Sequence, residues 1–203
     1  MKLRIENLHK SYEKNEVLKG VDFSFEQGKI YGLLGRNGAG KTTLFRCLIN
    51  DLAYEQGQCY LSQDGESSVL NSDQVAFVIS QPKVPDFLTG YEFLKFFIDF
   101  HYPEESKDSR EALLDRYFSS MSILPKDQHK LLGEYSHGMK NKLLMLVNIL
   151  LERQLLLLDE PLTSVDVVAS EEIKSLLREY KERQITILST HITLIALVFA
   201  MSK

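Results

Sequence analysis

The glycine-rich stretch from Gly35 to Thr42 most constrains what this chain can fold into. It reads GRNGAGKT and matches the pattern GxxxxGK[ST]. Glycines let such a loop bend closely enough for backbone N–H groups to face phosphate oxygens. An apolar run at residues 30–34 precedes the loop and a helical pattern over 42–52 follows it. The pattern predicts a nucleotide-phosphate site, and a glycine-rich turn with an unrelated lysine is the alternative.

Two further pairs of residues carry the predicted chemistry of this site. We expect Lys41 to reach the β- and γ-phosphates and the Thr42 hydroxyl to bind Mg²⁺. Asp159 and Glu160 follow the apolar run Leu155–Leu158, and ligands of open α/β sheets bind at the carboxyl ends of the strands. We expect Asp159 to hold Mg²⁺ through water and Glu160 to orient or deprotonate an attacking water. A solvated strand end is the alternative interpretation of the two acids.

Short apolar runs alternate with helical patterns along the chain. The runs lie at residues 30–34, 76–79, 155–158 and 185–188, and helical stripes lie at 113–121 and 173–180. Alternating apolar residues between Leu3 and Phe25 predict half-buried strands. The stretch Leu143–Leu151 is apolar nearly all round, which predicts a deeply packed helix. The fold class is therefore α/β, with a mostly parallel sheet and an N-terminal antiparallel β part.

Residues from about 82 to 140 differ in character from the rest. We interpret them as a helical subdomain inserted between two strands of a nucleotide-binding core, within a single domain spanning 1–203. Seven of the 20 aromatic residues fall in this segment's first part: Phe87, Tyr91, Phe93, Phe96, Phe97, Phe100 and Tyr102. Their helical angles point all round, so this helix needs partners on more than one face. One explanation of the cluster is a surface on which a partner protein docks, and the other is the subdomain's own core.

Charge and cysteine content exclude several classes of protein. The 24 Lys and Arg residues against 28 Asp and Glu residues argue against a nucleic-acid partner. The two cysteines form no CxxC pair and the histidines are scattered, which fits a reducing compartment and no zinc site. No segment reaches the roughly 20 apolar residues of a spanning helix, and the N-terminus does not read as a signal peptide.

Taken in order, the motifs resemble the nucleotide-binding domain of ATP-binding cassette (ABC) proteins, which implies a P-loop NTPase core. The resemblance runs from Met1 to about His191. Besides the loop and the acid pair, the matching positions are Tyr12 for an adenine-stacking aromatic, Gln81 for the glutamine loop, Tyr135–Met139 for the signature sequence, residues 164–166 for the loop that crosses the dimer, and His191 for the switch histidine.

This resemblance implies a set of site residues and two cofactors, ATP and Mg²⁺. The implied nucleotide contacts are Tyr12, Gly35, Asn37, Gly38, Ala39, Gly40, Lys41, Thr42 and Thr43, with Ser136, Gly138 and Asp166 supplied by a second subunit. The implied Mg²⁺ ligands are Thr42, Gln81 and Asp159, and the implied catalytic residues are Lys41, Gln81, Glu160 and His191. Taken singly, Tyr12 and His191 also fit purely structural roles, and an isolated glutamine such as Gln81 would carry no signal.

The sequence departs from the family pattern in two places. In the signature, usually LSGGQ, His137 replaces the first glycine and Met139 the glutamine, while Ser136 and Gly138 are kept. By analogy with bacterial exporter ATPases, we favour an active ATPase over a degenerate regulatory subunit. Family members usually continue past the switch histidine through a helix and a strand pair, whereas only residues 192–203 follow here. The C-terminus is therefore a minimal, truncated or altered form.

The implied function is that of an ATP-hydrolysing subunit of an ABC transporter, exporter-like. Its expected partners are transmembrane permease subunits and a second ATP-binding subunit, in a homo- or heterodimer around two MgATP molecules. Those partners would place the chain at the cytoplasmic face of the cell membrane. Two alternatives remain open: a soluble ABC ATPase outside transport, and a hydrolysis-impaired regulatory cassette.

Overall fold

The computed structural model describes residues 1–80, 83–163 and 165–191. These residues form two compact units, one rich in strands and one helical. The strand-rich unit comprises Met1–Ser80, Arg153–Pro161 and the described residues from Lys181 onward. The helical unit comprises the described residues of Gln81–Glu152 and Leu162–Tyr180. Gln81 and everything after His191 lie outside the described residues.

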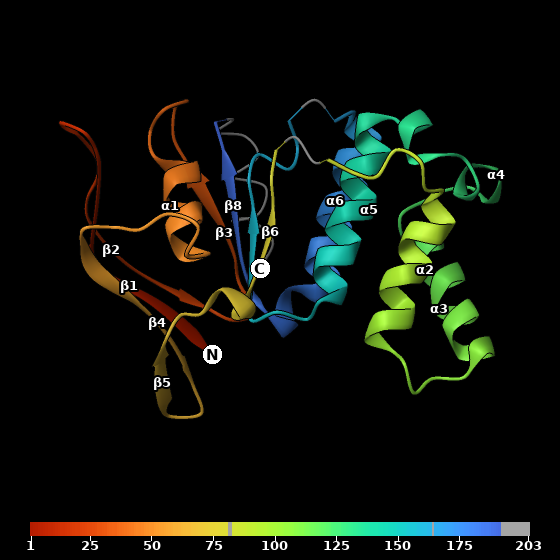
Figure 1. Ribbon diagram of the computed structural model, residues 1–203, viewed down its shortest axis with the longest axis horizontal. Coiled ribbons are helices and arrows are strands. Elements are labelled where there is room, and N and C mark those ends of the chain that lie inside the picture. The colour runs from red at the N-terminus through yellow and green to blue at the C-terminus, as the bar shows by residue number, and fades with distance from the viewer. Residues whose placement is uncertain (81–82, 164, 192–203) are drawn as a thin grey trace. The chain divides into compact units, whose positions relative to one another are not determined.

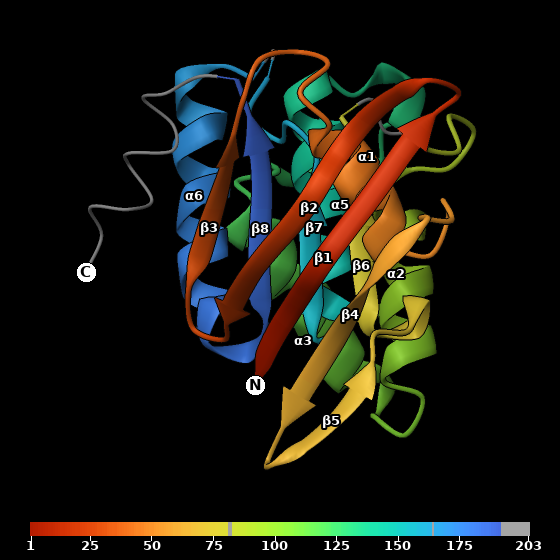
Figure 2. The same cartoon turned by 90° about the vertical axis from the view of Figure 1, so that its left-hand side faces the viewer.

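An antiparallel sheet forms the N-terminal part of the strand-rich unit. Its strands β1 (Lys2–Tyr12), β2 (Asn15–Glu26), β4 (Gln56–Gln63) and β5 (Glu66–Val69) lie in the order β2-β1-β4-β5 (Figure 2). Leu3 and Ile5 are buried between exposed or half-buried polar neighbours and pair with Phe25 and Phe23. The predicted alternation of half-buried strands is therefore confirmed.

A four-stranded parallel sheet forms the second part of this unit. Its strands β3 (Ile30–Leu34), β6 (Val75–Val78), β7 (Leu155–Leu158) and β8 (Ile185–Thr190) lie in the order β3-β8-β7-β6 (Figure 2). All their pairings are parallel, and every residue of β7 and β8 is buried. Continuous apolar runs are the pattern expected of such strands. The predicted mixed α/β fold is confirmed.

Helix α1 (Lys41–Leu48) completes the core of the strand-rich unit. Phe45 is fully buried, lies edge-on to Phe77, and belongs to one cluster with apolar residues of both sheets. The helix ends before the predicted Leu52, because Asn50 adopts a left-handed φ of 58° that terminates helical geometry. The start of this helix is thereby anchored on the core of its unit.

The helical unit is built mainly from four helices of 12 to 14 residues (Figure 1). They are α2 (Gly90–His101), α3 (Lys107–Ser120), α5 (His137–Leu150) and α6 (Val167–Tyr180), with α4 (Pro125–Gln128) and the 3₁₀ turn Leu132–Glu134 between α3 and α5. Nine of the 14 residues of α5 are buried, confirming the deep packing predicted for 143–151. The stripes at 113–121 and 173–180 lie mainly on α3 and α6.

The aromatic cluster is split between the interior and the surface. Phe93 on α2 is buried, together with Leu94 and Ile98, whereas Phe96 and Phe100 are 64% and 71% exposed. One face of α2 therefore packs within its unit and another carries bare aromatic rings. Among the described residues, no helix is both long and apolar enough to cross a bilayer.

Candidate nucleotide site

The glycine loop connects β3 to α1 and wraps a cavity of about 320 Å³. The cavity is lined by Val17, residues 37–43 and Glu160. Gly40 lies in the left-handed region with φ 91°, and a Cβ there would press on Val17, so this position needs glycine. Gly35 N donates to Thr190 O at 3.2 Å, which ties the loop to the end of β8. The loop thus forms a fixed concave surface at the carboxyl edge of the parallel sheet.

Lys41 lies at the first position of α1 with only 8% of its surface exposed. Its Nζ donates to Gly35 O at 2.8 Å and to Arg36 O at 3.2 Å, and lies 3.6 Å from Glu160 Oε1. The ammonium is therefore held inside the loop, beside the N-terminal N–H groups of α1. Two sources of positive potential, the ammonium and the helix terminus, converge on one cavity that suits phosphate.

Asp159 is buried at the carboxyl end of β7, and its carboxylate accepts hydrogen bonds from two hydroxyl groups. Thr42 Oγ1 donates to Asp159 Oδ2 at 2.8 Å, and Ser189 Oγ donates to Asp159 Oδ1 at 2.6 Å. The backbone N–H of Asp159 donates to Val78 O at 2.8 Å. A carboxylate and a hydroxyl brought together at a phosphate cavity are hard oxygen donors of the kind that Mg²⁺ takes from proteins, alongside waters and phosphate oxygens. The donor set fits Mg²⁺.

Glu160 follows with a left-handed φ of 49°, an uncommon conformation for a residue other than glycine. Its backbone N–H donates to Ser189 Oγ at 3.0 Å, and its Oε2 lies 3.1 Å from His191 Nδ1. The strained backbone directs the carboxylate toward the cavity rather than along the strand. Of the four predicted catalytic residues, Lys41, Glu160 and His191 lie together, and Gln81 lies outside the described residues.

The predicted residues of the helical unit gather at the starts of α5 and α6. Ser136 caps α5, and its exposed hydroxyl accepts from Met139 N at 3.2 Å. Asp166 Oδ1 accepts from Ala169 N at 2.9 Å in the first turn of α6. A Cβ on the buried Gly138 would lie 3.9 Å from Asp166 Oδ2. Ser136, Gly138 and Asp166 are therefore neighbours within this unit.

Tyr12 lies at the end of β1, where it pairs with Asn15. Its ring is 43% exposed, and Lys10 Nζ lies 5.6 Å from the ring centroid. A partly exposed aromatic face of this kind is available for stacking on a planar base. Tyr12 does not line the phosphate cavity, whereas Val17 on β2 does.

Val17 and Ser189 are site residues that the sequence analysis did not identify. Val17 carries no polar group, and nothing local in the sequence marks it. Ser189 stands two residues before His191 at the end of an apolar run, a placement that could have drawn attention to it. Its contact with Asp159 depends on the pairing of β7 with β8, which sequence spacing alone does not specify.

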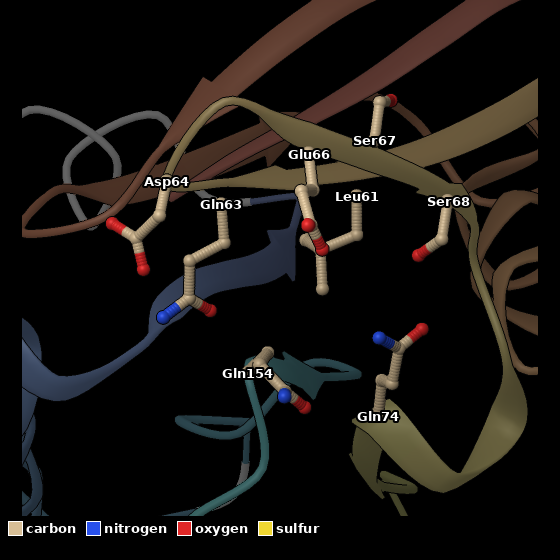
Figure 3. A pocket seen from close by; sticks show the side chains of 8 residues that line it. All are labelled: Leu61, Gln63, Asp64, Glu66, Ser67, Ser68, Gln74 and Gln154. Carbon is tan, nitrogen blue, oxygen red and sulfur yellow. The ribbon is translucent and has the colours of Figure 1, made fainter.

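A second cavity, of about 410 Å³, lies away from these residues, beside the β4–β5 hairpin. It is lined by Leu61, Gln63, Asp64, Glu66, Ser67, Ser68, Gln74 and Gln154. Figure 3 shows the three glutamine side chains around this space. Gln74 and Gln154 directly precede β6 and β7, so this cavity lies at the opposite edge of the parallel sheet from the glycine loop. None of its lining residues belongs to the nucleotide site.

Comparison with known proteins agrees with this geometry. The chain is 31% identical to the bacitracin transport ATP-binding protein BcrA of Enterococcus faecalis, over 94% of the chain and 61% of that protein. It is 33% identical to a fluoroquinolones export ATP-binding protein of Mycobacterium tuberculosis, over 93% of the chain and 62% of that protein. The chain thus spans about three fifths of the length of these two relatives.

A solved structure of the ATP-binding subunit of an ABC transporter superposes with a TM-score of 0.79 at 25% identity, covering 98% of this chain and 83% of that one. This likeness confirms the P-loop NTPase fold. The sequence model of the ABC transporter family matches residues 18–163, which include the glycine loop, the signature segment and the acid pair. The chain belongs to the ABC transporter family.

Proposed function

We propose that this chain binds MgATP and hydrolyses it as the ATP-binding subunit of an exporter. The observation that carries the proposal is the convergence of Lys41, Thr42, Asp159 and Glu160 at the carboxyl ends of β3 and β7. A cation, a hydroxyl and two carboxylates around a glycine loop are the groups that phosphoryl transfer requires. The cavity beside them supplies the space for the phosphates.

Binding rests on the loop and on the first turn of α1. The loop N–H groups and the Lys41 ammonium neutralise the β- and γ-phosphates, while Tyr12 offers a ring for the adenine. Thr42 and Asp159 would hold Mg²⁺, which when bound would neutralise negative charge on the phosphates. Ser189 keeps the Asp159 carboxylate oriented by its hydrogen bond to Oδ1.

Hydrolysis is assigned to Glu160 and His191. The Glu160 carboxylate accepts a proton from the attacking water, whose oxygen bonds to the γ-phosphorus as the bond to the ADP oxygen breaks. His191, beside Glu160 Oε2, donates a hydrogen bond to the developing γ-phosphate charge. Gln81 is assigned to the same water and to Mg²⁺ from the motif match.

Hydrolysis further requires a second ATP-binding subunit. Ser136 and Gly138 at the N-terminus of α5 would contact the γ-phosphate held by the partner's loop, with Asp166 beside them. The support is that Ser136 is exposed at the start of a 14-residue helix, where N–H groups and the helix dipole favour an anion. The dimer would thus enclose two MgATP molecules.

The proposed transport partners are separate permease subunits, which would hold this chain at the cytoplasmic face of the membrane. The support comes from two relatives of this chain: one is named for bacitracin transport and another for fluoroquinolone export. The exposed rings of Phe96 and Phe100 on α2 offer an apolar surface for such a subunit.

ATP binding and turnover by three variants test the proposal. Lys41→Ala should abolish MgATP binding and turnover. Lys29 directly precedes the first residue of β3, at the end of the strand away from the glycine loop, and Lys29→Ala should retain both. Glu160→Gln should bind MgATP, lose turnover and accumulate as a dimer in size-exclusion chromatography. Wild-type turnover by Lys41→Ala would contradict the site. A wild-type protein without turnover, and a Glu160→Gln variant identical to it, would favour the regulatory cassette instead.

A further inference from the structure

Tyr135, the first residue of the signature segment, is packed against a glycine 45 positions earlier in the chain. Its ring is 5% exposed, and its hydroxyl donates to Asp127 O on α4 at 2.9 Å. A Cβ built on Gly90, the first residue of α2, would overlap both the Tyr135 hydroxyl and ring carbon Cζ. The tyrosine therefore occupies its place only because residue 90 has no side chain.

Backbone hydrogen bonds join the same two segments. Leu132 N donates to Leu88 O at 2.7 Å, and Gly133 N donates to Asp86 O at 3.2 Å. Thr89 and Leu131 form an isolated antiparallel bridge, in which Gly90 N donates to Lys130 O at 3.3 Å. Residues 86–90 and 130–135 are thus held side by side by main-chain bonds and by the packing of the Tyr135 ring.

Charge adds a weaker connection between the two segments. Lys140 on the first turns of α5 places its Nζ 3.4 Å from Asp86 Oδ1, with Asp86 largely exposed. Exposed pairs of this kind contribute little stability. The buried ring and the backbone bonds therefore carry most of the attachment. Burial raises the pKa of Tyr135 to about 12.

The next residue after the ring is Ser136, whose side chain caps α5. Because the peptide between residues 135 and 136 is rigid and planar, the position of the ring limits where the serine hydroxyl and the first N–H groups of α5 can lie. A displacement of these donors by about 1 Å would take them out of productive geometry, an error that costs enzymes large factors in rate.

We propose that Tyr135 is a positioning residue, which uses the space left by Gly90 to fix Ser136 relative to residues 86–90. The inference rests on the proposed function, in which Ser136 acts on the partner subunit's nucleotide. It goes beyond that function by assigning roles to two residues that touch no nucleotide. Gly90 and Tyr135 form one unit in this role, so the effect of changing either depends on the other.

A double-mutant cycle tests this dependence, with MgATP affinity, kcat and thermal unfolding measured for each variant. Gly90→Ala should lower kcat at least tenfold in the wild-type background but less than twofold in the Tyr135→Leu background, where the ring is gone. MgATP affinity should stay within twofold in all variants, because the glycine loop lies in the other unit. Tyr135→Phe keeps the ring and should retain most of kcat.

Gly133→Ala is the matched control, since a Cβ there would lie 3.3 Å from Asp86 O, a tight contact that a shift of a few tenths of an ångström relieves, and would not overlap a ring. It should retain kcat. Equal losses from Gly90→Ala in both backgrounds, or unchanged kcat in the wild-type background, would overturn the positioning role. A wild-type protein that binds MgATP without turnover would contradict the proposed function instead. A Gly90→Ala protein that unfolds would still support the pairing if adding Tyr135→Leu restores folding and leaves kcat at the lowered value of Tyr135→Leu alone.

Discussion

Ser189 Oγ donates a hydrogen bond to Oδ1 of Asp159 over 2.6 Å, joining the ends of two neighbouring parallel strands. The same hydroxyl oxygen accepts a hydrogen bond from the backbone N–H of Glu160, the residue after Asp159. One small side chain therefore orients the proposed Mg²⁺ carboxylate and holds the strained backbone of the proposed base. Both acids depend on it for their geometry.

Replacing Ser189 with alanine should raise the Mg²⁺ concentration needed for half-maximal ATPase activity by about 10- to 100-fold, as loss of an outer hydrogen-bond partner does at other metal sites. The fold should persist, because only one hydroxyl is removed. Activity titrated with Mg²⁺ at saturating ATP checks this. Ser68→Ala, on the exposed strand β5, is the control and should leave the titration unchanged. An unaltered Mg²⁺ dependence in Ser189→Ala would show that Asp159 needs no such support.

Phe45→Ala should destabilise the protein by about 3–5 kcal/mol, because it empties a fully buried site between α1 and the strands. The loss should also weaken MgATP binding, since α1 carries Lys41 and Thr42. Denaturant unfolding followed by circular dichroism measures the change. Phe100→Ala, at a ring that is 71% exposed, should cost less than about 1 kcal/mol. Equal effects of the two substitutions would place Phe45 outside the core.

The helical unit contains a lysine with little access to water. Lys142 on α5 donates to Met121 O at 2.7 Å and to Glu172 Oε2 on α6 at 2.6 Å. Lys142→Met should lower stability by about 3 kcal/mol, because it leaves a carboxylate and a carbonyl without their donor. Arg116→Met, from the exposed pair with Glu179, should cost less than about 1 kcal/mol. A double variant with Glu172→Gln should recover part of the loss in the same unfolding assay.

The two cysteines should resist alkylation in the folded protein. Both are buried, and burial raises the pKa of the Cys47 thiol and raises that of Cys59 to about 12. At pH 9 an unfolded thiol is largely ionised, whereas the Cys59 thiol stays neutral and unreactive in the folded chain. Iodoacetamide labelling followed by mass spectrometry should show two modified residues in guanidinium chloride and almost none without it. Rapid labelling of native protein would contradict the burial of either thiol.

The most predictable parts of the site were those whose residues are adjacent in the sequence. The four leucines of β7 followed by Asp159 and Glu160, and the glycines before Lys41, are local patterns whose geometry follows from strand and loop chemistry. The roles assigned to these residues remain predictions, but their meeting at one sheet edge is a general property of parallel strands.

Other features depend on contacts between distant segments. The bond from Ser189 to Asp159 needs the register of β7 against β8, and the packing of Tyr135 needs Gly90 at the start of α2. The residues of each pair are separated by 30 positions or more in the sequence. The repeat of apolar residues along a helix or strand does not predict such contacts. The exposed rings of Phe96 and Phe100 are a similar case, because the helical pattern shows which residues share a face but not which face is covered.

The space shared by residues 90 and 135 also restricts how this sequence can evolve. A side chain at position 90 becomes tolerable only after the tyrosine has been replaced by something smaller, and the tyrosine can arise only in an ancestor that already has glycine there. Lineages that keep Tyr135 should therefore keep Gly90, while lineages that lost the ring are free to vary at position 90. In reconstructed ancestors, glycine at position 90 should precede the gain of Tyr135, and loss of Tyr135 should precede any replacement of Gly90.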